Sequence, residues 1–362
     1  MTTTLATLLT QRIRATGPLT LAEFMAEALG HPQHGYYTKP RWEGDPFGIA
    51  GDFITAPEIS QVFGELLGLW AVDCWQSLGS PGPIQLVELG PGRGSLMLDM
   101  LRVIARQPKM CEGLSVHLVE TSPTLRVRQK DLLQKSNVPI TWHNHLSDLP
   151  MMPFILIANE FLDALPVRQF QRQDDGWHEV MVGVNSEGNL TLGMAPDIIA
   201  LPNLLHSLSE GDVMEWCPAA GTIVSEIARR LHQVPGASLL IDYGYNASAG
   251  LPTLQAVQNH RSVDLLTEPG AVDISAHVDF SVLAAQGTAR GLAVHGPVNQ
   301  GTFLRRLGAE IRREQLAAAA PDKAETIRKG VARLIEPEQM GALFKVIAFT
   351  RAETSLSSGF ED

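Results

Sequence analysis

The fold is decided by one short stretch of the chain, Gln85-Leu86-Val87-Glu88-Leu89-Gly90-Pro91-Gly92-Arg93-Gly94. Its apolar first half predicts a buried parallel strand, Gln85–Leu89, and a helix is expected from Ser95. The glycines between them let the backbone turn sharply and approach a ligand too closely for a Cβ atom. Strand, glycine turn and helix in this order predict the ligand-binding unit of a doubly wound α/β sheet.

The spacing of the glycines favours one class of ligand. A dinucleotide fingerprint reads G-x-G-x-x-G, whereas here the third glycine comes one residue early. Glu88, two residues before the first glycine, would repel a pyrophosphate but can accept hydrogen bonds from an ammonium group or from backbone N–H groups. We therefore expect S-adenosylmethionine, an amino-acid-bearing nucleoside, at Glu88, Gly90, Gly92 and Gly94. A structural turn without a ligand is the alternative.

Two further acids are candidates for the same ligand. Glu120 directly follows the next predicted strand, Ser115–Val119, where a carboxylate can hold both ribose hydroxyls. A solvated side chain or a helix cap is the other interpretation of a glutamate at the end of a strand. Asp148 follows the third strand unit, where the adenine edge is expected, and could accept a hydrogen bond from the adenine amino group.

The chain around this unit continues the α/β alternation. Strands are predicted at Phe154–Ala158 and Ala237–Ile241, and a late strand, Leu343–Phe349, is expected at a sheet edge. We divide the chain into N-terminal helices with an active-site loop (1–80), the cofactor-binding half of the core (81–166), an inserted subdomain with a hairpin (167–221) and the second half of the core with C-terminal helices (222–352).

Composition narrows the function. The 362 residues carry a formal net charge of −11, which argues against a dedicated nucleic-acid binder. No run of about 18 apolar residues predicts a membrane span. His143 and His145 lack a third ligand at suitable spacing, so no metal site is predicted. The N-terminus lacks acids before Glu23, as weak mitochondrial presequences do, but its apolar pattern favours a helix of the fold itself.

The residues expected to carry the chemistry follow the strand Phe154–Ala158. Asn159, Glu160 and Asp163 emerge at the carboxyl end of this strand, beside the predicted cofactor site. Paired carboxylates can hold the planar guanidinium fork of an arginine and aim one of its nitrogens. The alternative is structural, with Asp163 as a helix cap and Glu160 exposed.

Several segments together resemble the MidA family, whose members include a mitochondrial complex I assembly factor with protein-arginine methyltransferase activity. The segments are His31–Tyr37, Gly51–Ser60, Val87–Gly94, Asn159–Pro166, Leu240–Gly244, Asp273–Phe280 and Gly296–Gly301. The similarity covers about residues 20–350. It implies a Rossmann-like class I methyltransferase fold that binds S-adenosylmethionine, with a loop containing Gly51, Asp52, Thr55 and Glu58 over the active site.

The resemblance also implies a substrate and a location. The expected acceptor is an arginine in the 49 kDa-type subunit of NADH dehydrogenase, methylated during assembly. The expected compartment is the cytoplasm for a bacterial protein and the mitochondrial matrix for a eukaryotic one. A non-catalytic, cofactor-binding assembly factor and a small-molecule methyltransferase are the alternatives. The oligomeric state stays open.

Overall fold

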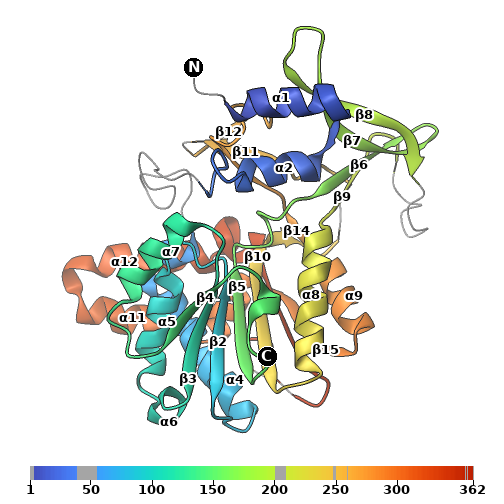
Figure 1. Cartoon of the computed structure of the whole chain (residues 1–362). Helices are drawn as coiled ribbons and strands as arrows, with labels where there is room; N and C mark the ends of the chain where they lie inside the picture. The colour runs from blue at the N-terminus through green and yellow to red at the C-terminus, as the bar shows by residue number, and fades with distance from the viewer. Residues whose placement is uncertain are drawn as a thin grey trace.

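The computed structural model describes residues 4–38, 55–199, 209–247, 250–258, 260–354, 356 and 358–361. It has a lower part built on a twisted central sheet and an upper part of two helices and two smaller sheets (Figure 1). In the part of the chain that is described, every helix is too short or too polar to cross a lipid bilayer.

The central sheet contains the predicted strands in a doubly wound order. From one edge to the other its long strands are β4 (Ile140–His143), β3 (Leu114–Val119), β2 (Ile84–Leu89), β5 (Phe154–Asn159), β10 (Gly236–Tyr245), β16 (Phe344–Arg351) and β15 (Leu292–Asn299). Numbered along the chain, this order is 3-2-1-4-5-7-6. The short strand β14 (Val278–Asp279) also pairs with β10. All pairs are parallel except those of β16, which runs antiparallel to both of its neighbours.

The prediction that the late strand forms a sheet edge is wrong. β16 lies between β10 and β15, and it is buried along most of its length. The edge belongs to β15, which the sequence analysis does not predict. Its apolar pattern is interrupted at Gly296-Pro297, where the register of pairing with β16 shifts between His295 and Val298. The continuous apolar run of β16 is instead typical of a strand that has neighbours on both edges and helices on both faces.

Helices cover both faces of the sheet, because alternate residues of each buried strand point to opposite sides. Leu86 faces one core with α4 (Gln61–Ser77), α5 (Ser95–Ile104), α10 (Gln300–Arg306), α11 (Ala309–Ala319) and α12 (Ala324–Ile335). Val87 faces the other core with α8 (Pro218–Leu231) and α9 (Phe280–Ala289). The helix predicted after the glycine turn is α5. The remaining helical elements outside the upper part are α3 (Ala56–Ile59), α6 (Pro108–Cys111), α7 (Pro123–Leu133), η1 (Leu146–Asp148), η3 (Pro321–Lys323) and η4 (Pro337–Gly341).

The upper part joins the N-terminus to the inserted segment. Here α1 (Leu5–Thr16) and α2 (Leu21–Gly30) share a core with β7 (Gly176–Val184) and β13 (Asp273–Ser275), and β1 (Leu19–Thr20) pairs with β7. The N-terminal helix is thus part of the fold, as predicted, and buries Leu5, Leu9 and Ile13. The predicted hairpin is confirmed as β6 (Arg168–Gln173) and β7 (Gly176–Val184). The other strands here are β8 (Leu190–Ile199), β9 (Val213–Trp216), β11 (Gln255–Gln258), β12 (Arg261–Val263) and β13 (Asp273–Ser275).

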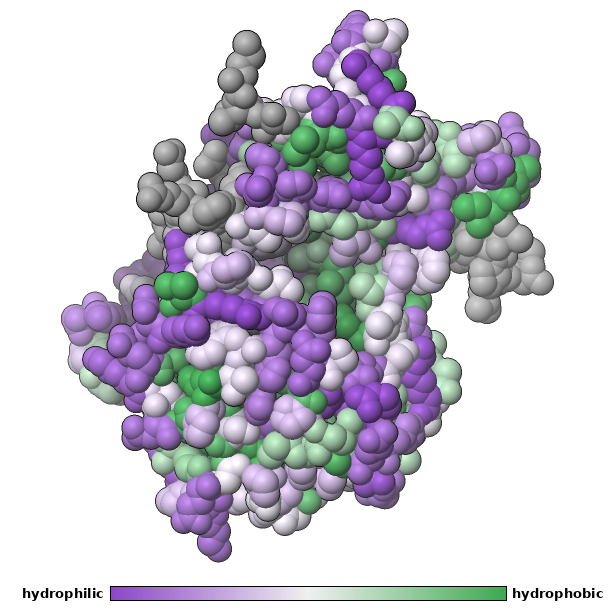
Figure 2. All heavy atoms as spheres, in the orientation of Figure 1, coloured by the Kyte–Doolittle hydropathy of each residue, from purple (hydrophilic) through white to green (hydrophobic). Residues whose placement is uncertain are grey.

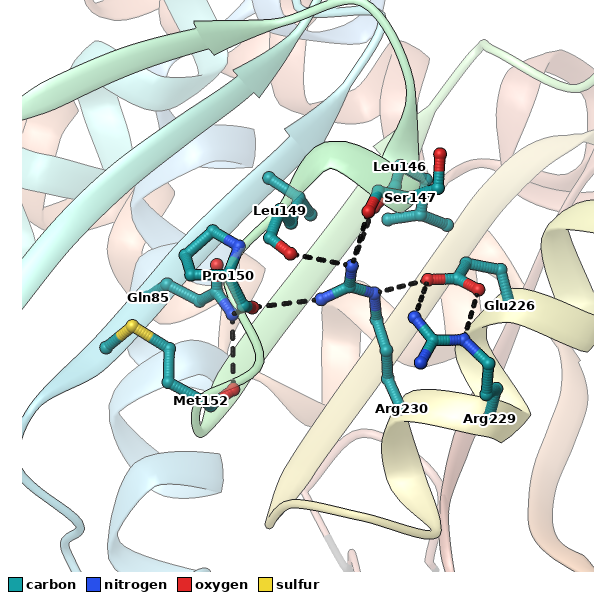
Figure 3. Close-up of polar contacts among 9 residues, drawn as sticks. All are labelled: Gln85, Leu146, Ser147, Leu149, Pro150, Met152, Glu226, Arg229 and Arg230. Atoms are coloured by element: carbon teal, nitrogen blue, oxygen red, sulfur yellow. Dashed lines mark hydrogen bonds and ion pairs between the residues drawn. The ribbon is translucent and has the colours of Figure 1, made fainter.

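A buried arginine ties the second half of the chain to the first. Arg230 of α8 is 1% exposed and donates hydrogen bonds to the carbonyl oxygens of Leu146, Leu149 and Pro150 at 2.9–3.0 Å (Figure 3). Its charge is balanced by Glu226 at 2.8 Å. Arg230 of α8 therefore holds the loop between β4 and β5 in place through hydrogen bonds to the backbone carbonyl oxygens of that loop.

Candidate functional site

A cavity of about 740 Å³ lies between the central sheet and the upper part of the molecule. Its floor is formed where β2, β3, β5 and β10 end, the position at which open α/β sheets bind ligands. Its roof includes Tyr37 after α2, Gln255 of β11 and Asp273 of β13. Figure 2 shows this face of the molecule hollowed between the two parts, with hydrophobic residues in the hollow.

The glycine turn after β2 forms one wall of the cavity. Gly90 and Gly92 line it and have φ values of 61° and 52°, which side chains rarely adopt. A Cβ atom on Gly90 would stand 2.6 Å from Cδ2 of Phe161. Gly94 has a φ of 89° and is the N-cap of α5, but it is not part of the cavity wall. Of the three predicted glycines, the structure therefore brings two to the ligand space and gives the third to the start of the helix.

Glu88 lies at the base of this wall. Its side chain is buried, and its Oε2 atom has no hydrogen-bond partner among the residues that the structure describes. Burial, with repulsion from Glu120, raises the pKa of Glu88 to about 8. A buried carboxylate oxygen without a partner is costly unless a ligand satisfies it. An ammonium group fits this position, so the residues present suit the amino-acid end of S-adenosylmethionine.

Glu120 is buried at the end of β3, as predicted, and also lines the cavity. Its Oε1 atom accepts the backbone N–H of Ser122 at 2.8 Å, and Oε2 accepts from Nε2 of Gln129 at 3.3 Å. Gln129 also donates to the carbonyl oxygen of Gly92 at 2.8 Å. This side chain of α7, which the sequence analysis missed, links the predicted ribose-binding carboxylate to the glycine turn.

Asp148 is not brought to the cavity. It is exposed in η1, and its carboxylate accepts the backbone N–H of His145 at 3.0 Å. His143, in turn, bonds His117 across β3 and β4, with 2.8 Å between Nε2 and Nδ1. Among the described residues there is no cluster of three or more potential metal ligands.

A second, neighbouring wall of the cavity is the turn after β5, which together with Asn159 at the end of that strand carries the three residues predicted to be catalytic. Its shape depends on Asp242 of β10, which is 1% exposed. One oxygen of Asp242 accepts the backbone N–H groups of Phe161, Leu162 and Asp163 at 2.8–3.2 Å. Glu160, at the start of this turn, has a φ of 50°, a strained value for a glutamate. Asp242 therefore stabilises the turn that presents Glu160 and Asp163.

The two carboxylates of this turn sit in different settings. Oε1 of Glu160 accepts the backbone N–H of Ala56 at 2.8 Å and the side-chain amide of Asn159 at 3.2 Å. Burial raises the pKa of Glu160 to about 7, against the lowering effect of the Ala56 N–H. Burial also raises the pKa of Asp163 to about 6, although the Tyr243 hydroxyl bonds its carboxylate. Oδ1 of Asp163 has no partner among the described residues.

The predicted active-site loop is described only from Thr55 onward; Gly51 and Asp52 lie outside the described residues. Thr55 and Glu58 line the cavity. The two oxygens of Glu58 bond Nη1 of Arg93 and Oγ of Ser95, each at 2.6 Å. The short helix α3 thus contacts both the glycine turn and, through Ala56, the turn after β5.

Several residues of the site were missed at the sequence level. Asp242 and Tyr243 directly follow the predicted strand Ala237–Ile241. Polar residues at the end of a buried strand are the signal by which Glu120 is predicted, and the same signal could have identified these two residues. Tyr37 donates a hydrogen bond to Asp273 at 2.8 Å across 236 residues of sequence, a contact with no local signal.

A sheet of this order, with a glycine turn after its first strand and a buried carboxylate after its second, defines a class I methyltransferase that uses S-adenosylmethionine. A family model described as "Putative S-adenosyl-L-methionine-dependent methyltransferase" matches residues 66–298, and the chain belongs to this family. The resemblance to the MidA family and the cofactor prediction are thereby confirmed.

Individual relatives agree with this assignment. The chain is 38% identical to the rat "Protein arginine methyltransferase NDUFAF7, mitochondrial", over 93% of this chain and 82% of the relative. It is also 38% identical to the Drosophila melanogaster homologue of that protein, over 95% and 84%. A crystal structure from Burkholderia thailandensis, bound to S-adenosyl-homocysteine, matches with a TM-score of 0.83 and 27% identity, over 99% of this chain and 92% of that one.

Proposed function

We propose that the protein transfers methyl groups from S-adenosylmethionine to an arginine side chain of a protein acceptor. The observation that carries this proposal is the placement of Glu160 and Asp163 in the same cavity as Glu88 and Glu120. Relatives named as protein arginine methyltransferases support the choice of arginine. One wall of the cavity then serves the cofactor and the neighbouring wall serves the acceptor.

The acceptor wall suits a guanidinium group. Arginine stays protonated at all working pH values and presents a planar fork of N–H donors, which carboxylates recognise by paired hydrogen bonds. When bound, the cofactor supplies an electrophilic methyl group on a positively charged sulfur. Oδ1 of Asp163 is available for a donor, and Glu160 is fixed by Ala56 and Asn159.

Glu160 is also the candidate proton acceptor. The arginine nitrogen loses one proton for each methyl group that it gains, and a base is most effective when its pKa lies near the working pH. The pKa of Glu160, about 7, meets this requirement. Glu160 would thus first orient the guanidinium and then take its proton.

The finer proposal concerns which protein is methylated. We propose the 49 kDa-type subunit of NADH dehydrogenase, on the strength of the MidA resemblance. The compartment would then be that of the nascent complex, the bacterial cytoplasm or the mitochondrial matrix; the rat relative is named as mitochondrial.

The test uses the purified full chain, S-adenosylmethionine with a labelled methyl group, and the isolated 49 kDa-type subunit. We expect label on an arginine after acid hydrolysis, and none on the subunit with that arginine changed to lysine. The matched variant Glu160→Gln should still bind the cofactor but transfer about 10²–10⁴-fold more slowly. Label on lysine, or on a small molecule but no protein, would refute the arginine assignment.

A further inference from the structure

Arg93 and Ser95 hold a carboxylate inside the cavity, and that carboxylate belongs to the chain itself. Nη1 of Arg93 and Oγ of Ser95 each lie 2.6 Å from an oxygen of Glu58. All three side chains line the cavity, and the two charged ones are only 28% and 18% exposed for Arg93 and Glu58. A guanidinium and a hydroxyl arranged around one carboxylate form a binding site for a carboxylate group.

The position of this site matches the cofactor rather than an unrelated anion. Arg93 and Ser95 stand at the end of the glycine turn, and Glu88 stands just before it. The amino-acid end of S-adenosylmethionine carries an ammonium group and a carboxylate on the same carbon. The turn therefore has the carboxylic acid of Glu88 on one side and the positively charged guanidinium of Arg93 on the other, which is the arrangement that such a head group requires.

We propose that Arg93 and Ser95 anchor the carboxylate of the cofactor, and that Glu58 occupies this anchor until the cofactor displaces it. The inference rests on the cofactor assignment and is independent of which residue the protein methylates. Glu58 is then an internal competitor, because one guanidinium edge cannot serve two carboxylates equally well.

The competition also reaches the acceptor wall. Glu58 belongs to α3, and the first residue of α3, Ala56, donates its N–H to Glu160. Close packing holds α3 on its other side, since a Cβ atom on Gly330 of α12 would stand 3.0 Å from the carbonyl oxygen of Ile59. When the cofactor displaces Glu58 from Arg93, the side chain that moves is therefore only two residues from Ala56, whose N–H bonds the carboxylate of Glu160.

The test compares two ligands that differ by one carboxylate. Calorimetric titration of the full chain with S-adenosylmethionine and with decarboxylated S-adenosylmethionine gives both dissociation constants without any acceptor present. We expect Arg93→Gln to weaken binding of the first ligand by about tenfold or more, the loss of a charge-assisted bond, and to leave the second within about twofold. Glu58→Gln should strengthen binding of the first ligand up to about fivefold, the scale of a partly exposed ion pair, and leave the second unchanged.

A matched control is available on α5, the helix that begins at Ser95. Arg102 of α5 pairs with Asp99 and lies outside the cavity wall, so Arg102→Gln removes the same charge without touching the anchor. It should bind both ligands as the unaltered protein does. Equal weakening of both ligands by Arg93→Gln, or weaker binding of S-adenosylmethionine by Glu58→Gln, would overturn the proposal. Because no acceptor is added, neither result depends on the arginine assignment.

Discussion

The turns after β2 and β5, which form two walls of the cavity, both contain residues with positive φ, but they accommodate this backbone conformation in different ways. The turn after β2 uses glycines where φ is positive, so its shape carries little steric cost. The turn after β5 has Glu160 at such a position, which costs about 1–2 kcal/mol in a residue with a side chain. Under the proposed function the second turn needs a carboxylate at this position, and a glycine cannot supply one.

Asp242 compensates for the conformational cost at Glu160. Three consecutive N–H groups of the turn after β5 converge on one of its oxygens, and its other oxygen accepts the N–H of Tyr243 at 3.0 Å. Both oxygens of the buried Asp242 carboxylate accept hydrogen bonds from the chain, and these bonds shape the site. Glu88 and Asp163 each have one oxygen without a partner among the described residues, and this oxygen is available to a ligand. Unpartnered oxygens thus distinguish Glu88 and Asp163 from Asp242, but they do not mark Glu120, whose two oxygens are bonded by Ser122 and Gln129.

The largest effect is expected from removing the support of the strained turn. Asp242→Ala leaves several backbone N–H groups without an acceptor and should lower the free energy of unfolding by about 3–5 kcal/mol. Urea denaturation measures this loss. Asp242→Asn keeps one oxygen and should lose clearly less. A loss below about 1 kcal/mol in the alanine variant would show that the turn after β5 holds its shape without Asp242.

The next effect concerns the cofactor wall. Glu120→Ala should weaken binding of S-adenosylmethionine by about 1.5–3 kcal/mol, the value of a charge-assisted hydrogen bond. Calorimetric titration gives the dissociation constant. Asp148→Ala is the control, because Asp148 is exposed and lies outside the cavity wall. Weaker binding in this control would restore the adenine contact expected from the sequence.

On the acceptor wall, the expected effect is a pH dependence. In the proposed reaction Glu160 must be ionised to hold the guanidinium and to accept its proton, and the pKa of Glu160 is raised to about 7. The rate of methyl transfer at saturating substrates should therefore increase with pH, by about tenfold between pH 6 and pH 8. Rate measurements across this range check the rise. The residual rate of Glu160→Gln should lack it, and an unchanged profile in that variant would assign the titration to another group.

The smallest effect separates the roles of two glycines. Gly94→Ala should cost about 1 kcal/mol of stability, because φ is 89° there, while a Cβ atom would meet its nearest neighbour at an ordinary 3.5 Å. Gly90→Ala carries a similar backbone cost and also meets Phe161 at 2.6 Å. Thermal melting with and without cofactor should show lost cofactor stabilisation only for Gly90→Ala. Loss in both variants would place Gly94 at the ligand.

The sequence could predict local features of the site, but it could not predict contacts between residues that lie far apart along the chain. The glycine turn, its strand and α5 are local features, and the spacing of three glycines together with Glu88 was enough to place them. Asp242 could not be assigned its role, because its three donors lie about 80 residues away along the chain. The bond between Glu58 and Arg93 was hidden for the same reason. The position of β16 in the sheet was missed because an apolar run predicts a strand but not its neighbours.

The place of β16 has a consequence for synthesis on the ribosome. β10 can join β5 as soon as it emerges, but β15 has no partner in the central sheet until residues 344–351 have been made. A nascent chain of intermediate length therefore exposes one edge of β10 and the whole of β15, and such edges are prone to pairing with other chains. The cofactor half of the protein can form while translation continues, whereas the opposite edge of the sheet is completed only near its end.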